Sequence, residues 1–278
     1  MGRRRYVFDE ARTQRFIAEG RGTGEGATYK SWLRIQDLPS LGRSHRPFGI
    51  KTRRRHDLLS DGEWKCFLMF ESDPSVVDIR EQFPLNRHQT SLVARSLGYK
   101  HPTTLDGTPY VMTVDFVVTK RTDKGPRIFP YTFKYDFSEL SPREEELIQI
   151  AETFWRGEGY LLGRLDKSFF DEILIRNYDH VRSFFDIACH AVCRRMDVRT
   201  VADAIRASAD LLPEQRLADV CKELASLHRV MPADIICIVL HLIARGGLHT
   251  DLRSAVPLSD RAMREFVVTP LLSEGSVD

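Results

Sequence analysis

The spacing of apolar positions changes several times between residues 60 and 165, and these changes separate helices from strands. Two stretches have helical spacing, in which apolar residues recur every three to four positions. The first runs from Ser60 to about Phe70, and the second begins where Ser141, Pro142 and Glu144 form a helix start signal. Runs of β-branched and aromatic residues predict strands over residues 76–83, 111–118, 128–135 and 160–162. The predicted order is α-β-β-β-α-β.

The chain after residue 166 has helical spacing almost throughout. Helices are predicted over residues 213–228 and 232–244, and residues 248–252 read as a short strand. Two close helices followed by a small strand resemble a helix-turn-helix with a wing. The second helix contains only two ionisable residues, Asp234 and His241, before Arg245. Because a helix that reads DNA bases needs polar and basic side chains, this helix fits burial or protein contact better.

A chain of 278 residues is long enough for two modest domains. The patterns predict a basic N-terminal segment over residues 1–50, an α/β domain over residues 51–165 and a mainly helical domain over residues 166–278. Within the α/β domain, residues 86–106 are expected to be mixed and rich in loops.

Basic residues are concentrated in the first segment, although a formal net charge of +2 favours no particular partner. The run Arg3-Arg4-Arg5 is followed later by Lys51 and by Arg53, Arg54 and Arg55. Basic segments of this kind often contact phosphates, so the second cluster is a candidate for DNA binding. The alternative is a disordered, solvated N-terminus.

The five cysteines are scattered and odd in number, which predicts reduced thiols in a cytosolic protein. No apolar run has the length of a membrane-spanning helix, and no secretory signal follows the basic start. Cys189, His190 and Cys193 lie on an apolar helix without a second pair of metal ligands. This spacing favours a core face over a zinc site.

Three charged residues lie on successive predicted elements: Glu63 on the first helix, Asp115 inside a strand and Lys134 on the next strand. An aspartate inside an apolar strand is unfavourable unless it is paired or binds a metal. Carboxylates that hold one or two Mg²⁺ ions activate water and neutralise the charge that develops on a phosphate, and Mn²⁺ can substitute for Mg²⁺. Two acids and a lysine therefore predict a metal-dependent phosphodiesterase, with Glu63, Asp115 and Lys134 as the catalytic set.

Alternation along residues 128–135 places Thr132 and Lys134 on one face of the strand. If Asp115 faces the same side, the three polar groups converge. The backbone carbonyl of Phe133 lies between two of them and is a further candidate metal ligand. Each residue also has a structural interpretation. Glu63 completes the capping box that Ser60 begins, Lys134 protects a sheet edge, and Asp115 pairs with a buried arginine such as Arg80.

Several sequence blocks resemble a known family. The segment "GIKTRRRHDLLSDGEWKCFLMFESDPSVVDIREQFPL", followed by "HPTT", "VMTVDFVV" and "YTFKYDFSEL", resembles the TnsA endonuclease subunits of heteromeric cut-and-paste transposases. The resemblance covers roughly residues 51–160, and the helical remainder is similar to the C-terminal domain of that family. It implies a restriction-endonuclease-like, PD-(D/E)XK fold with a mixed sheet, followed by a winged-helix-like domain.

The resemblance also implies an activity and partners. Such a subunit cuts the 5′ strands at the ends of a mobile element in the bacterial cytoplasm. A DDE-type subunit, TnsB, processes the 3′ strands, and an AAA+ regulator, TnsC, contacts the C-terminal domain. Glu63, Asp115 and Lys134 match the catalytic positions of the family, whose members often have glutamine where this chain has Thr132. The threonine is shorter, so water or the Phe133 carbonyl is favoured over Thr132 as a direct metal ligand.

Two other functions use the same features. One is a stand-alone restriction or repair endonuclease, which the apolar helix over residues 232–244 disfavours because site choice would need another source. The other is a non-enzymatic adaptor, which the presence of all three charged residues disfavours.

Overall fold

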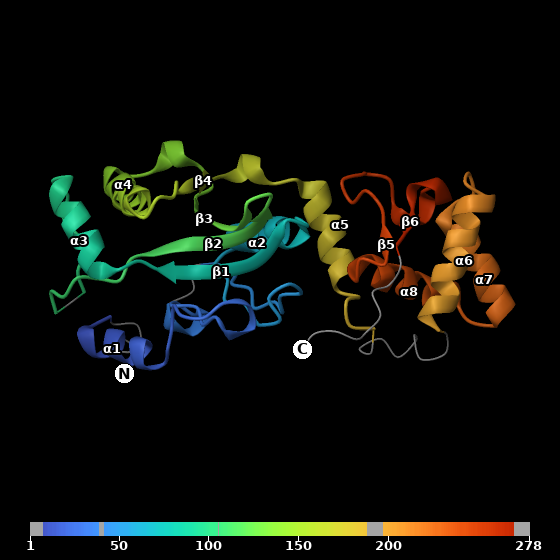
Figure 1. The fold of residues 1–278 in the computed structure, drawn as a ribbon, viewed down its shortest axis with the longest axis horizontal. Helices are drawn as coiled ribbons and strands as arrows, with labels where there is room; N and C mark the ends of the chain where they lie inside the picture. The colour runs from blue at the N-terminus through green and yellow to red at the C-terminus, as the bar shows by residue number, and fades with distance from the viewer. Residues whose placement is uncertain (1–7, 39–41, 105, 188–196, 270–278) are drawn as a thin grey trace. The chain divides into compact units, whose positions relative to one another are not determined.

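The computed structural model describes residues 8–38, 42–104, 106–187 and 197–269. It divides the chain into two compact units, Met1–Phe170 and Asp171–Asp278 (Figure 1). The residues expected to form the basic start, Arg3-Arg4-Arg5, lie outside the described residues, as do Cys189, His190 and Cys193. The predicted domain limits stay predictions.

The first unit is built on a four-stranded mixed sheet with the order β1-β2-β3-β4. Strands β1 (Val76–Pro84), β2 (Thr113–Thr122) and β3 (Gly125–Phe133) pair in antiparallel fashion, and β4 (Gly163–Leu165) pairs in parallel with β3. A two-residue turn connects β2 to β3, with Thr122 opposite Gly125. Gly125 has a φ of 95°, a conformation that favours glycine. The mixed α/β fold expected from the sequence is confirmed.

Two predicted helices cover this sheet. Helix α2 (Asp61–Ser72) begins at the Ser60 cap, and α4 (Pro142–Gly157) begins at the predicted capping box of Ser141 and Glu144. On α2, the ring of Phe70 packs against the ring of Phe116, with 5.4 Å between the ring centroids. On α4, buried residues form a cluster with Val114 and Val117 of β2; they are Ile150, Ala151 and Trp155. Neighbouring residues of a strand face opposite sides. Phe116 and Val117 thus direct α2 and α4 to opposite faces of the sheet (Figure 1).

A third helix lies where the sequence predicts mixed structure and loops. Helix α3 (Arg87–Ser96) begins at Asn86, whose side chain accepts hydrogen bonds from the amides of His88 and Gln89. Only Thr90 and Ala94 of this helix are buried. The helix has almost no apolar stripe in the sequence, because its buried face consists of two small residues.

The described residues of the first segment, 8–38 and 42–49, are folded rather than a solvated arm. Helix α1 (Glu10–Ala18) places Phe16 in a cluster with Trp32, Leu33 and Val111. The guanidinium groups of Arg12 and Arg21 are buried against the carboxylate of Asp37. The basic residues of this segment therefore contribute to the fold of the first unit.

The second unit contains four described α-helices and a two-stranded ribbon. The helices are α5 (Glu172–Arg182), α6 (Val198–Leu211), α7 (Leu217–His228) and α8 (Pro232–Ala244), and the strands are β5 (Leu248–His249) and β6 (Val267–Val268). The predicted strand at residues 248–252 is shorter than expected. Its partner β6 has only two residues, too few to show strand spacing in the sequence. The winged-helix assignment of this unit stays a prediction.

Helix α8 is the centre of the second core. Its residues Ile235, Ile238, Val239, Leu240 and Leu242 are buried, which agrees with the expectation that this helix is suited to burial. Within the described residues, no single helix is long and apolar enough to cross a membrane. The pair α7 and α8 passes that test together, but the two are bent by 119° and supply buried residues to the core.

Candidate active site

Glu63 lies in the first turn of α2 and is 7% exposed. The Ser60 hydroxyl caps the helix by accepting a hydrogen bond from the Glu63 amide at 3.1 Å. The Glu63 carboxylate accepts hydrogen bonds from the Leu59 amide at 3.0 Å and from the Gln82 side chain at 3.3 Å. Glu63 thus accepts from the Leu59 amide rather than from the Ser60 amide that a capping box would use, and its carboxylate also contacts Gln82 of β1.

A close approach of α2 to β3 brings Glu63 to this position. A Cβ atom at Gly62 would lie 2.1 Å from the ring of Phe133, so only glycine fits there without movement. The neighbouring residue, Glu63, is therefore held beside the end of β3.

Asp115 lies on β2, where its Oδ2 atom accepts hydrogen bonds from the Thr132 hydroxyl at 2.9 Å and from the Phe133 amide at 2.7 Å. Arg80, the arginine considered as its ion-pair partner, is instead 3.5 Å from Asp78 and 3.7 Å from Glu25. That structural alternative for Asp115 is wrong.

Glu63 and Asp115 interact electrostatically. Burial, and then repulsion from Asp115, raise the pKa of Glu63 to about 8. Burial likewise raises the pKa of Asp115, although its hydrogen bonds and the positive charge of Lys134 act against the rise. The positive charge near the two carboxyl groups is therefore too small to stabilise both of them in the ionised form at the same time.

These two carboxyl groups fit a divalent cation. A cation between them would neutralise the repulsion and the burial penalty that raise their pKa values. Within the described parts of the chain, no group of three or more His, Cys, Asp or Glu residues could hold a metal ion. Mg²⁺ needs only one or two carboxylates and completes its coordination with water and other oxygen atoms, so the remaining ligands would be neutral oxygens.

Lys134 follows β3 directly, one residue beyond its end, because β3 ends at Phe133. Its amide continues the pairing with β4 by donating to the Leu165 carbonyl at 3.0 Å. Its ammonium lies 3.6 Å from the Glu144 carboxylate at the start of α4. β3 is not at an edge of the sheet, so protecting a sheet edge does not explain this lysine.

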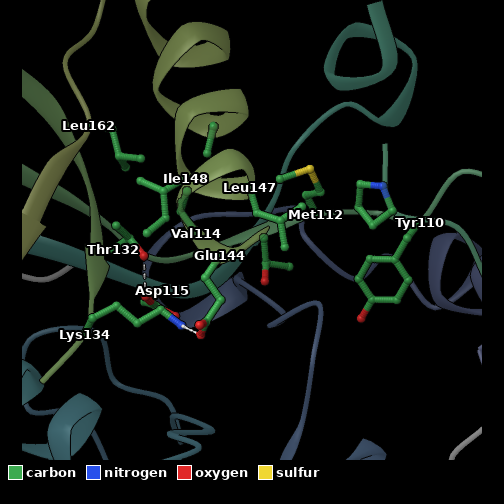
Figure 2. Close-up of a pocket in the computed structure, with 13 residues that line it drawn as sticks. Tyr110, Met112, Val114, Asp115, Thr132, Lys134, Glu144, Leu147, Ile148 and Leu162 are labelled. Atoms are coloured by element: carbon green, nitrogen blue, oxygen red, sulfur yellow. Dashed lines mark hydrogen bonds and ion pairs between the residues drawn. The ribbon is translucent and has the colours of Figure 1, made fainter. Parts of the chain in front are cut away.

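Asp115, Thr132, Lys134 and Glu144 line one pocket of about 320 Å³ (Figure 2). Asp115 of β2 therefore faces the same side as Thr132 and Lys134, as predicted. The rest of the wall is mainly apolar and includes Met112, Val114, Leu147, Ile148 and Leu162. Glu63 does not line this pocket and is connected to it through its interaction with Asp115.

Sequence reasoning missed two residues of the site. Glu144 was recognised only as a capping residue, and it does accept a hydrogen bond from the Ser141 amide at 3.0 Å. Gln82 was not singled out, although it lies in a β-strand with a φ of 47° and contacts Glu63. The available signal was a polar residue inside a predicted strand. Glu81, the residue before Gln82, gives the same signal but has a structural role, so the pattern alone does not single out Gln82.

The basic cluster at residues 53–55 divides into two kinds of side chain. Arg53 and Arg55 are exposed. Arg54 is buried, and it donates to both carboxylate oxygens of Glu81, at 2.8 and 2.6 Å, and to the Ile79 carbonyl at 2.7 Å. The prediction that Arg54 binds DNA is therefore wrong, because its guanidinium is committed inside the protein. DNA binding by Arg53 and Arg55 stays a prediction.

Residues 73–161 match the family model for the N-terminal domain of TnsA-like endonucleases. The chain carries a TnsA-like domain. It is also 48% identical over 150 residues to the transposon Tn7 transposition protein TnsA of Escherichia coli, an alignment that covers 54% of each chain. The chain thus spans about half the length of this curated relative. The TnsA-like region includes Asp115, Thr132 and Lys134, and the predicted resemblance is confirmed.

Proposed function

We propose that this protein is a Mg²⁺-dependent DNA endonuclease subunit of a heteromeric transposase and cleaves the 5′ strands at transposon ends. The observation that carries the proposal is the meeting of Glu63, Asp115 and Lys134 from α2, β2 and the end of β3 within a TnsA-like chain. One buried and one half-buried carboxyl group, both with raised pKa values and beside a lysine, are suited to phosphodiester hydrolysis.

In this proposal Glu63 and Asp115 hold the metal, together with the Phe133 carbonyl. When bound, Mg²⁺ supplies charge neutralisation at the phosphate and a more acidic water. The Thr132 hydroxyl donates to Asp115, so its task is to orient that carboxylate. The Phe133 amide donates to the same oxygen and fixes its second direction.

Lys134 contacts the reacting phosphate or orients the attacking water. Its ammonium is partly exposed and lies in the pocket lining, close to Asp115 and Glu144 (Figure 2). Glu144 holds the ammonium there as a weak ion pair, because the pair is open to solvent. A DNA phosphate that approaches Asp115 would therefore meet a lysine that is already positioned.

The proposed partners follow from the same similarity. They are the transposon-end DNA, a DDE-type subunit, TnsB, which processes the other strands, and an AAA+ regulator, TnsC. The exposed residues Arg53 and Arg55 are proposed to contact the DNA backbone. The setting is the bacterial cytoplasm, and Mn²⁺ is proposed to substitute for Mg²⁺.

The test is strand-specific cleavage of end-labelled transposon-end DNA, with Mg²⁺, with and without the DDE subunit. We expect 5′-strand cleavage by the wild-type protein with its partner, and its loss in Asp115→Ala and Glu63→Ala. Asp123→Ala, at the exposed tip of the β2–β3 turn, is the matched control. Cleavage of unrelated DNA without a partner would favour a stand-alone endonuclease. Unchanged 5′-strand cleavage in folded Asp115→Ala would reject this site as the source of the cleavage.

A further inference from the structure

Gln82 has an unusual conformation for a residue inside a strand. The register of β1 and β2 pairs Glu81 with Phe116 and Phe83 with Val114, which places Gln82 opposite Asp115. Its φ is 47°, in the left-handed region that side chains other than glycine, asparagine and aspartate rarely occupy. The side chain is also buried, with 3% of the residue exposed. Strained residues of this kind cluster at functional sites.

The amide of Gln82 lies among the polar groups of the candidate site. Its Nε2 donates to the Glu63 carboxylate at 3.3 Å and to the Asp115 carboxylate. Its Oε1 accepts a hydrogen bond from the Thr113 hydroxyl at 3.2 Å. The amide group is thus directed at the two carboxylates that the proposed function assigns to the metal, and its partially positive NH₂ end faces them.

We propose that Gln82 is a metal ligand that supplies its amide oxygen after the amide turns over. This inference rests on the proposed function, since it needs a divalent cation between Glu63 and Asp115. Such a cation would repel the NH₂ group and attract the carbonyl oxygen, and Mg²⁺ takes oxygen ligands. The described residues offer two carboxylates there, and the Thr132 hydroxyl is already donated to Asp115.

The rotation would give up the donations from Nε2 to the two carboxylates, which the cation would replace, but it keeps a hydrogen bond to Thr113. A side-chain amide has almost the same shape in its two orientations. The Thr113 hydroxyl is both a donor and an acceptor, so it donates to Oε1 in one orientation and accepts from Nε2 in the other. Thr113 therefore serves as the partner of the amide in the metal-free and the metal-bound state.

The alternative is that Gln82 only positions Glu63 by donating to it. The two roles differ in their response to a carboxylate at residue 82. Gln82→Glu keeps an oxygen for the metal but has no amide donor for Glu63. Gln82→Met keeps the length of the side chain and has neither.

The test is calorimetry of Mn²⁺ binding to the full chain, with thermal unfolding to confirm folding. We expect Gln82→Met to weaken Mn²⁺ binding by about tenfold or more and Gln82→Glu to retain or strengthen it. Gln89→Met, the same change at an exposed residue of α3, should have no effect. Unchanged affinity in Gln82→Met, or an equal loss in Gln82→Glu, would overturn the inference.

A second measurement does not depend on the folding of Gln82→Met. The side-chain amide signal of Gln82 in an ¹H–¹⁵N spectrum, identified by its disappearance in Gln82→Glu, should shift during a Mg²⁺ titration of the wild-type protein. A signal that stays in place while Mg²⁺ binds would contradict the inference. Asp115→Ala separates the two proposals. If Asp115→Ala abolishes metal binding while Gln82→Met does not, the inference alone fails. If the wild-type protein binds no metal, both fail.

Discussion

At the scale of single residues, the site brings together two carboxyl groups that would repel each other if both were ionised. Glu63 is buried and Asp115 is half-buried, and loss of contact with water raises the pKa of each. An arrangement that costs stability in the metal-free protein is one that a cation can relieve. The same feature makes the candidate site accessible to measurements of stability, which need no DNA and no partner protein.

The raised pKa of Glu63 predicts that the metal-free protein loses stability as pH increases. The group has an ordinary pKa of 4.5 when unfolded and about 8 when folded. Between these values the folded protein keeps a proton that the unfolded chain has released, so the free energy of unfolding falls with rising pH. The loss is on the order of a few kcal/mol. Urea unfolding between pH 5 and 9 with a chelator measures it.

Glu63→Gln removes this titration and should flatten the pH dependence while raising stability at pH 8. Glu139→Gln, at an exposed position, should leave the profile unchanged. Mg²⁺ should reduce the loss in the wild-type protein, because it binds the ionised carboxylates. A Glu63→Gln profile as steep as that of the wild type would show that Glu63 is ionised at neutral pH in the folded protein.

Lys134→Ala should keep metal binding but reduce 5′-strand cleavage by a factor of about 10² or more, the usual contribution of a positioned proton-transfer group. The ammonium is not a metal ligand, since its charge is positive and it lies 3.6 Å from Glu144. Mn²⁺ calorimetry beside a nicking assay separates the two effects. Lys124→Ala, in the β2–β3 turn, is the control. A loss of metal affinity as large as that of Asp115→Ala would reject this role.

The sequence was informative about residues that contradict their surroundings. Asp115 was detectable because an acid in an apolar strand needs an explanation, and Lys134 because strand alternation places it with Thr132. Gln82 and Glu144 were not, since their roles depend on a backbone angle and on the packing of α4. Arg54 was misjudged because a run of arginines does not reveal which member pairs with a buried acid.

At the scale of elements, caps and turns were predictable where the signal is local. Ser141 and Pro142 fixed the start of α4, and Ser60 that of α2. Helix α3 was missed because its buried residues are too few and too small to give a period. The packing of α2 on β3 depends on Gly62, whose role is visible only from the distance to the Phe133 ring.

Gly62→Ala should therefore destabilise the first unit by about 1–3 kcal/mol, the usual cost of overpacking. The added methyl group would overlap the Phe133 ring, so α2 must move, and Glu63 moves with it. We expect weaker Mn²⁺ binding together with the lower stability. Gly157→Ala in α4, where nothing lies within 4 Å, should be neutral or slightly stabilising. Equal stability of Gly62→Ala and the wild type would show that the helix adjusts freely.

At the scale of the whole molecule, the two units have separate apolar cores. The second unit buries Val201, Ile205, Val220, Ile235 and Met263 in one cluster that contains only residues of that unit. The sequence predicted a helical second half, because its apolar periodicity is strong. It predicted nothing of the fold of residues 8–38, whose buried arginines and Asp37 form contacts that no periodic pattern records.

Separate cores predict that each unit folds alone. A fragment of residues 171–278 should unfold in one cooperative transition, because its helices pack on each other around α8. It should bind the AAA+ regulator, and bind short duplex DNA weakly and with steep salt dependence at most. Tight, sequence-selective DNA binding by this fragment, without affinity for the regulator, would overturn the proposed division of tasks.

Thermal unfolding of the full chain can show which of the two units binds the metal. Because the carboxylates that are proposed to bind Mg²⁺ all lie in the first unit, Mg²⁺ should raise the unfolding temperature of that unit only, by the binding free energy that the native state gains. Calorimetric scans of the full chain should show two transitions, one of which coincides with that of the fragment of residues 171–278 and ignores Mg²⁺. Asp115→Ala should abolish the shift of the other transition. A Mg²⁺-dependent shift of both transitions would mean that the units do not unfold independently, and a shift that persists in Asp115→Ala would move the metal away from the proposed site.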